Sequence, residues 1–311
     1  MANDTRAPGA RASEAAAREA GAPGPGAGSG AAEEPRAQAR VLVASGTGKT
    51  GRRVAARLAG ARIGTRNPAG RDAVAFDWSR PESWGPALDG VEAAYLAYYP
   101  DITAPEAADA LGAFARLAAA RGVRRLVLLS GRGMEGAAAA ERAVREAGTG
   151  WTVLRASWFA QNFSEEFLVH EVRAGEFTLP AVPGLVEPFV DAEDIADVAA
   201  AALTAPDGAH AGRVYELTGP RALSLEEAAA RISAAAGREV RYRPSAPGAY
   251  AGLLAAQGLP PEVAGLLSEL FSQVLDGRNA APTGDVEAVL GRPAREFTAY
   301  ARAAAAAGAW S

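Results

Sequence analysis

Cysteine is absent from this 311-residue sequence, and its absence removes several kinds of chemistry. Disulfide bonds, thiolate catalysis and cysteine-ligated zinc are all excluded. Histidine occurs only twice, as His170 and His210, and the two positions share no spacing typical of metal ligands. We interpret both histidines as surface or packing residues, and the sequence predicts no metal site.

Long apolar runs and a strong positive charge are also missing. No segment reaches the roughly 18 apolar residues of a membrane span, and no charged and then apolar leader opens the chain. The net charge of −4 and the isoelectric point near 5.5 indicate no basic surface for nucleic acid. We therefore expect a cytoplasmic protein with neither membrane nor nucleic acid as a partner, and a monomer or a homodimer is compatible with the sequence.

Branched and aromatic residues are scarce in residues 1–39, which are mostly Ala, Gly, Pro, Arg and Glu. A segment of that composition cannot bury enough apolar surface to offset the entropy lost on ordering, so we predict a disordered extension. The whole chain is 49% hydrophobic and 22% charged, which is sufficient for a sizeable core in the remaining residues.

From Val41 onward, short apolar runs alternate with helical patterns that end at glycines. This alternation predicts an α/β fold, in which a parallel, doubly wound sheet is covered by helices on both faces. The last third is richer in helical patterns and predicts a smaller cap. After the first strand, strands are expected at residues 61–65, 73–76, 93–97, 125–129, 151–155 and 214–217, and helices at 50–58, 105–121, 137–147, 191–203, 249–257, 262–275 and 296–307, with one more helix capped by Ser224 and Glu227 and ended by Gly237.

A glycine-rich turn follows the first strand. Gly46, Gly48 and Gly51 match G-x-G-x-x-G, the pattern that lets a backbone approach a pyrophosphate at a helix N-terminus. The alternative is a tight turn without a ligand, and the motif alone does not distinguish the two. A Walker A loop is excluded, because it requires glycine where this chain has Val43.

The residue that selects the dinucleotide lies about 20 positions beyond the first glycine. That position is Arg66, and no acidic residue occurs between Ser45 and Arg71. Arginine there suits a 2′-phosphate, whereas the alternative is a solvated charge at a strand end. Arg66 together with Lys49, the only lysine in the chain, therefore favours NADP(H) over NAD(H).

Four segments carry a resemblance to a known family. They are residues 43–51 (VASGTGKTG), 65–68 (TRNP), 122–130 (GVRRLVLLS) and 152–163 (TVLRASWFAQNF), and together they resemble the NmrA-like atypical short-chain dehydrogenase/reductases. Further motifs are most similar to the branch that contains the fungal ergot-alkaloid reductases. These are residues 76–78 (FDW), 158–159 (WF), 162–164 (NFS), 188–190 (PFV), 194–195 (DI) and 217–220 (LTGP).

The resemblance implies a domain organisation and a set of site residues. Residues 40–160 would form an NADP(H)-binding Rossmann core, and residues 161–311 would supply a substrate cap with the remaining core elements. A small-molecule substrate would bind between them. By position, the cofactor would contact the loop Ser45, Gly46, Thr47, Gly48, Lys49, Thr50 and Gly51, the 2′-phosphate residues Arg66 and Asn67, the adenine neighbours Asp77 and Trp78, and the ribose and nicotinamide neighbours Ala97, Tyr98, Ser130, Ala156, Ser157, Trp158 and Phe159.

Two departures from the family are visible. Ser45 stands where the loop usually has glycine, so the geometry there is expected to shift. The wider superfamily also uses Tyr-x-x-x-Lys, in which the lysine lowers the pKa of the tyrosine, but no tyrosine here has a lysine four residues on. The superfamily's catalytic pair is therefore absent.

Two functional classes fit that absence. The first is an NADPH-dependent reductase whose acceptor, an iminium, a quinone or a related conjugated group, needs no strong protein acid. Ser130, Tyr98 and Asn162 are then candidates to orient or protonate the acceptor, unless they only pack, and Trp158, Phe159 and Phe189 are candidate apolar walls. The second class is a redox sensor that binds NADP(H) without turnover. A DNA-binding regulator is the weakest alternative, because neither a basic patch nor a helix-turn-helix pattern is present.

Overall fold

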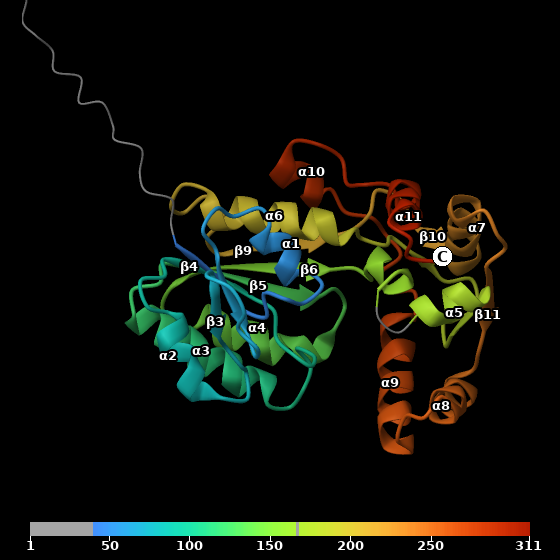
Figure 1. The fold of residues 1–311 in the computed structure, drawn as a ribbon, viewed down its shortest axis with the longest axis horizontal. Helices are drawn as coiled ribbons and strands as arrows, with labels where there is room; N and C mark the ends of the chain where they lie inside the picture. Colours follow the sequence, from blue (N-terminus) through green and yellow to red (C-terminus); the bar gives the residue numbers. More distant parts are fainter. Residues whose placement is uncertain (1–39, 166–167) are drawn as a thin grey trace, which may run out of the picture. The chain divides into compact units, whose positions relative to one another are not determined.

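The structure is a computed structural model that describes residues 40–165 and 168–311. The predicted disordered extension, residues 1–39, lies outside the described residues. The fold is drawn in Figure 1. Among the described residues, no helix is long and apolar enough to cross a membrane.

A seven-stranded parallel sheet forms the centre of the fold (Figure 1). Its strand order is β3-β2-β1-β4-β5-β6-β9, so the direction of winding reverses between β1 and β4. Such a reversal creates a crevice at the carboxyl ends of the strands, where ligands of doubly wound sheets bind. The predicted α/β fold class is confirmed. The strands are β1 (Val41–Val43), β2 (Arg62–Thr65), β3 (Ala73–Ala75), β4 (Ala93–Leu96), β5 (Arg125–Gly131), β6 (Gly150–Ala156) and β9 (Arg213–Leu217).

Each face of the sheet has its own apolar core, because side chains alternate along a strand. On β1, Leu42 packs in the core on one face, whereas Val41 and Val43 pack in the core on the other. The helices on the Leu42 face are α2 (Trp84–Ala87), α3 (Ala107–Ala120) and α4 (Ala138–Arg145), and those on the opposite face are α1 (Gly51–Ala55), α6 (Ala192–Thr204) and α10 (Asp285–Leu290) (Figure 1).

A third core holds the helix-rich region beyond one end of the sheet. Phe163 is at its centre, with ring centroids of Phe177, Phe189 and Phe297 within 5.7 Å. Two short sheets that the sequence did not predict stabilise this region. The elements are α5 (Val169–Ala174), α7 (Leu225–Ala236), α8 (Pro247–Ala256), α9 (Pro261–Val274) and α11 (Phe297–Ala306), the parallel pair β7 (Glu176–Leu179) and β11 (Arg241–Pro244), and the antiparallel pair β8 (Val186–Glu187) and β10 (Leu223–Ser224).

Local signals in the sequence are confirmed where they depend on neighbours in the chain. Ser224 and Glu227 form the predicted capping box of α7, and Gly237 ends that helix in a left-handed conformation at φ 67°. The helix expected at residues 50–58 is shorter. Beyond Ala55 the amides of Arg57 and Leu58 bond to carbonyls three residues back, so the helix tightens and stops.

Ion pairs fix the short helix α1 against α6. Arg53 Nε lies 2.7 Å from Glu193 Oε1, and Arg57 Nε lies 2.5 Å from Asp197 Oδ1. All four side chains are at least partly shielded from solvent, and their charges form one network. Ion pairs in such networks contribute measurably to the stability of the fold. The glycine-rich turn is therefore held at its helical end as well as at β1.

Candidate active site

The turn between β1 and α1 requires glycine for steric reasons. A Cβ atom on Gly46 would lie 2.7 Å from Ile63 Cγ2 of the neighbouring strand. On Gly51 it would lie 2.3 Å from the carbonyl oxygen of Ser45. Gly48 differs, because a Cβ there would meet only the Ser45 carbonyl oxygen, at 3.2 Å. The backbone at Gly48 is thus the part of the turn that a ligand can approach.

Ser45 takes the left-handed conformation that normally favours glycine. Its φ is 56°, and it is the sole described residue other than glycine with positive φ. Its hydroxyl donates to the carbonyl oxygen of Ala97 at 2.8 Å, and the indole of Trp78 donates to the same oxygen at 2.9 Å. These bonds connect the turn to the ends of two other strands, so the serine is accommodated where the family usually has glycine.

Two cavities meet at this turn. The first, here called the polar cavity, measures about 330 Å³ and is lined by Thr65, Arg66, Asn67 and Asp77 among others. The second, here called the aromatic cavity, measures about 460 Å³ and reaches the helix-rich region. Both are lined by Ser45, Gly48 and Tyr99. An elongated ligand can therefore cross the turn with one end in each cavity.

Charge distinguishes the polar cavity. The guanidinium of Arg66 stacks on the Tyr99 ring at 5.2 Å from its centroid, which orients it at the end of β2. Asp77 accepts bonds from the amide and hydroxyl of Ser79 at 3.0 and 2.9 Å. The Ser79 amide, more than the nearby Arg66 charge, lowers the pKa of Asp77. The sequence-predicted residues Arg66, Asn67, Asp77 and Trp78 are all brought together here.

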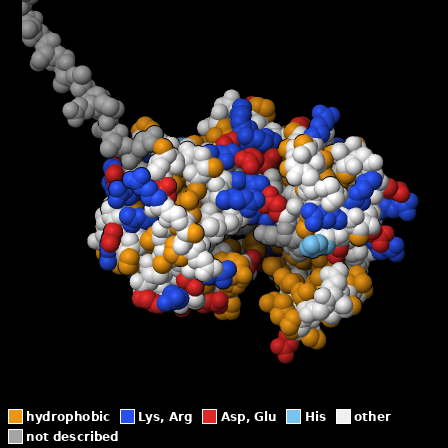
Figure 2. Space-filling view, in the orientation of Figure 1, with side chains coloured by type: hydrophobic (Ala, Val, Ile, Leu, Met, Phe, Trp, Pro, Cys, Tyr) orange, Lys and Arg blue, Asp and Glu red, His pale blue; other side chains and the backbone are white. Residues whose placement is uncertain are grey.

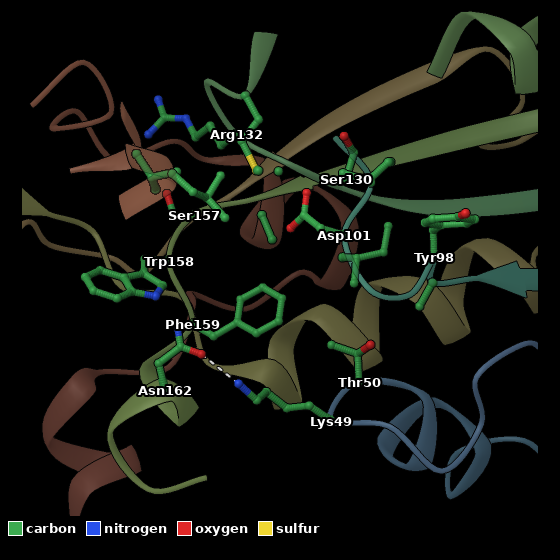
Figure 3. Close-up of a pocket in the computed structure, with 18 of the residues that line it drawn as sticks. Lys49, Thr50, Tyr98, Asp101, Ser130, Arg132, Ser157, Trp158, Phe159 and Asn162 are labelled. Carbon is green, nitrogen blue, oxygen red and sulfur yellow. Dashed lines mark hydrogen bonds between the residues drawn. The ribbon is translucent and has the colours of Figure 1, made fainter. Parts of the chain in front are cut away.

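Lys49 lies on the aromatic cavity and not on the polar one (Figure 3). Its Nζ donates to Asn162 Oδ1 at 2.6 Å and stands 5.5 Å from the centroid of the Phe159 ring. Lys49 therefore lies apart from Arg66, and its contribution to the preference for NADP(H) stays a prediction. Lys49 lies two residues before α1 and bonds to Asn162, whereas Arg66 directly follows β2.

The three candidate catalytic side chains, Ser130, Tyr98 and Asn162, all line the aromatic cavity. Asn162 is bonded to Lys49, as above. Tyr98 is half-buried with its ring 5.2 Å from that of Trp78, and burial, with a smaller effect of Glu106, raises the pKa of its phenol. Its hydroxyl therefore stays protonated at neutral pH. Ala97, Ala156, Ser157, Trp158 and Phe159 line the same cavity.

The hydroxyl of Ser130 is hydrogen-bonded to a buried glutamate. It donates to Glu141 Oε1 at 2.8 Å inside the protein. Arg155 and Arg145 hold the other carboxylate oxygen at 2.7 and 3.0 Å. Burial alone would raise the pKa of Glu141, but the bonds from Arg155 and Ser130 outweigh it and lower that pKa. Ser130 thus donates its proton to a carboxylate and presents only lone pairs to the cavity.

Several lining residues were missed from sequence. One face of α9 contributes Leu270, Phe271 and Val274, with Leu275 just beyond the helix. Their spacing is that of one helical face, but nothing in the sequence indicated what it covers. Figure 2 shows apolar side chains gathered over α8 and α9, where Leu253 and Leu266 are exposed. Phe189, expected as a wall, is buried behind Trp158 with ring centroids 6.2 Å apart.

Within residues 40–165 and 168–311, no group of three or more His, Asp or Glu side chains is arranged to hold a metal ion. The site instead offers glycine backbone, a guanidinium and an aromatic cavity, which is the set of groups expected for a dinucleotide and an organic acceptor.

The model of the NmrA-like family matches residues 136–301, more than half of the chain. The chain belongs to the NmrA-like family. The resemblance read from the sequence is thereby confirmed.

Relatives named as oxidoreductases match most of the chain. An NAD(P)H azoreductase of Xenophilus azovorans is 32% identical over 289 residues, which are 86% of this chain and 98% of that protein. A festuclavine dehydrogenase of Aspergillus fumigatus is 29% identical over 280 residues, 84% of this chain and 96% of the relative. The second agrees with the predicted similarity to ergot-alkaloid reductases.

The fold also matches solved structures. The triphenylmethane reductase of a Citrobacter species, complexed with NADP(H), superposes with a TM-score of 0.69 at 20% identity. The match covers 85% of this chain and 99% of that one. At this identity the comparison establishes the fold alone.

Proposed function

We propose that the protein is an NADPH-dependent reductase that delivers hydride to a small conjugated acceptor, with a quinone-like carbonyl compound as the preferred class. It is an oxidoreductase of the atypical short-chain type and uses NADP(H). The observation that carries this proposal is the pair of cavities joined at Ser45 and Gly48, with a guanidinium in one and aromatic walls in the other.

The polar cavity suits the adenosine 2′-phosphate end of the cofactor. Arg66 supplies a cation with fixed orientation, and Asn67 supplies an amide beside it. Gly48 leaves backbone open to the pyrophosphate between the cavities. Trp78 and Asp77 border the adenine in this arrangement. When bound, the dinucleotide supplies the hydride from its nicotinamide ring.

The aromatic cavity suits a planar acceptor beside the nicotinamide. Trp158, Phe159 and Phe271 provide flat apolar surfaces, and Lys49 provides a positive charge held by Asn162. An ammonium group stabilises an acceptor oxygen that gains negative charge as hydride arrives. That charge favours a carbonyl-type acceptor over an iminium, which is already cationic. Residues 161–311 contribute α9 to this cavity, consistent with a substrate cap over the 40–160 core.

Cofactor selection by Arg66 is testable with one substitution. Arg66→Ala should weaken NADPH binding about 10- to 100-fold, because a charge-assisted contact to the 2′-phosphate is lost, and should leave NADH binding within about 2-fold. Fluorescence titration of both nucleotides measures this. Arg71→Ala is the matched control, since Arg71 is exposed and lines neither cavity. Equal losses for NADPH and NADH would contradict the assignment.

Turnover separates the reductase from the sensor. The protein should oxidise NADPH in the presence of some member of a panel of quinones and cyclic iminium compounds, followed at the absorbance of the reduced nicotinamide. Saturable NADPH binding without oxidation across the panel would instead favour a non-catalytic redox sensor.

A further inference from the structure

Glu187 is a buried carboxyl group directly behind the aromatic cavity. It ends the short strand β8, and its side chain is 1% exposed. One oxygen, Oε1, accepts a hydrogen bond from the backbone amide of Trp158 at 3.2 Å. The other, Oε2, has no hydrogen-bond partner among the described residues. An unpartnered buried carboxyl oxygen is costly, so this position calls for a functional explanation.

Ser157 lies between that carboxyl group and the cavity. It lines the aromatic cavity, is 3% exposed, and precedes the residue whose amide Glu187 accepts. Its hydroxyl also lacks a hydrogen-bond partner in the part of the chain that the structure describes. The two side chains are neighbours, because Glu187 accepts a hydrogen bond from the amide of the residue that directly follows Ser157. The Ser157 hydroxyl also partly offsets the effect of burial on the pKa of Glu187. The hydroxyl oxygen is itself buried, so a rotation of the side chain about χ1 brings it from the carboxyl group toward the cavity.

The charges around Glu187 leave it without a dedicated cation. Arg132 is the nearby positive group, but its Nε pairs with Glu216 at 2.9 Å and its Nη1 donates to the carbonyl oxygens of Asn279 and Ala281. Asp276 is the nearby negative group and pairs with Arg278 at 2.6 Å. Burial therefore dominates and raises the pKa of Glu187 to about 7. The group is available as an acid near neutral pH.

The geometry points to a proton relay in which Ser157 donates its hydroxyl proton to the reduced acceptor and Glu187 replaces it. This inference rests on the proposed reductase function and supplies the proton donor that the missing Tyr-x-x-x-Lys pair leaves open. In this relay Ser157, which lines the cavity, is the residue that contacts the acceptor, and Glu187 acts through it.

The reaction balances with the groups present. Hydride from NADPH forms a bond to the acceptor and brings both electrons, so NADPH is oxidised and a quinone-type acceptor is reduced. The acceptor oxygen takes the proton of the Ser157 hydroxyl, and that hydroxyl takes the proton of Glu187. Glu187 remains as a carboxylate until water returns a proton. A cationic acceptor, such as a triarylmethane dye, becomes neutral on hydride addition and takes up no proton.

This difference between acceptors provides the test. With a quinone, Glu187→Gln should lower kcat about 10²-fold and abolish the decline in kcat/KM as pH rises through about 7. Ser157→Ala should lower kcat with the quinone by a similar factor. With a triarylmethane cation, both variants should retain wild-type rates. Glu176→Gln is the matched control. Glu176 is partly exposed, pairs with Arg243 and lines neither cavity, so this substitution should change neither reaction.

Three results would contradict the relay, and one of them would also contradict the reductase function. A quinone rate and pH profile unchanged in Glu187→Gln would overturn the relay alone. An equal loss with both acceptors would show that the residue shapes the cavity and supplies no proton, and would also overturn the relay. A wild-type protein that binds NADPH but reduces neither acceptor would overturn the reductase function, and the relay with it.

Discussion

Ser130 and Ser157 stand at the carboxyl ends of the neighbouring strands β5 and β6, line the same cavity, and each has a buried glutamate behind it. The two glutamates differ in their cations. Glu141 is held by Arg155 and Arg145, whereas no described arginine is bonded to Glu187. The pKa of Glu141 is lowered and that of Glu187 is raised to about 7. Burial alone therefore does not decide whether a carboxyl group is ionised or protonated at neutral pH.

The consequence for the serines is opposite. Ser130 donates to a carboxylate that stays ionised at neutral pH, so its proton is unavailable. Ser157 adjoins a carboxyl group that holds a proton near neutral pH. Sequence reasoning named Ser130, Tyr98 and Asn162 as candidates to orient or protonate the acceptor, and the relay proposed above gives the role of proton donor to Ser157 on the next strand.

Of the substitutions that test the difference between Glu141 and Glu187, removal of Arg155 should have the largest effect on stability. Arg155→Met should reduce the free energy of unfolding by about 3 kcal/mol at pH 7, because Glu141 loses its closest cation while buried. The loss should shrink at acidic pH. A lowered native pKa gives stability above the unfolded value, and that stability disappears as pH falls through the native pKa. Urea denaturation at pH 7 and pH 4 measures both, and Arg302→Met, at an exposed site, is the control. A pH-independent loss would argue against the ion pair.

Substitution of Glu187 should have the opposite dependence on pH. A raised native pKa favours the folded state below the unfolded value of about 4.5 and penalises it as pH rises toward 7. Glu187→Gln carries no charge, so its stability relative to wild type should increase by about 2 kcal/mol between pH 5 and pH 8. Denaturation curves at the two pH values give this difference. A constant offset would show that Glu187 titrates normally.

Ser130→Ala should have the smallest effect and sharpen the contrast with Ser157. Loss of one hydrogen bond to a charged, buried group should cost about 1 to 2 kcal/mol of stability. Because Ser130 has no proton to give, the pH dependence of quinone reduction should keep its wild-type midpoint. If that midpoint moved with Ser130→Ala and not with Ser157→Ala, the proton would pass through Ser130.

The sheet was predictable because its strands are apolar runs separated by glycines, and neighbours in the chain decide such features. The two-residue strand β8 was not, since Val186 and Glu187 precede a proline and carry no strand pattern. Arg66 was selected from its spacing alone, and its role at the 2′-phosphate stays a prediction. The orientation of the Lys49 side chain could not be predicted from the sequence, because it depends on the position of Asn162, which is distant in the chain. The protonation of Glu187 depends on the absence of a bonded cation, which only the folded chain reveals.

The four apolar positions that end at Leu275 have a practical consequence. Leu270, Phe271, Val274 and Leu275 line the aromatic cavity from α9 and its end, whereas the glycine turn and Arg66 lie on the sheet. In the proposed reductase, acceptor choice and cofactor retention therefore reside on separate parts of the chain. A combinatorial library confined to those four codons would search for new dye or quinone preferences while leaving nucleotide affinity intact, which makes this helix a compact target for redesigning the enzyme.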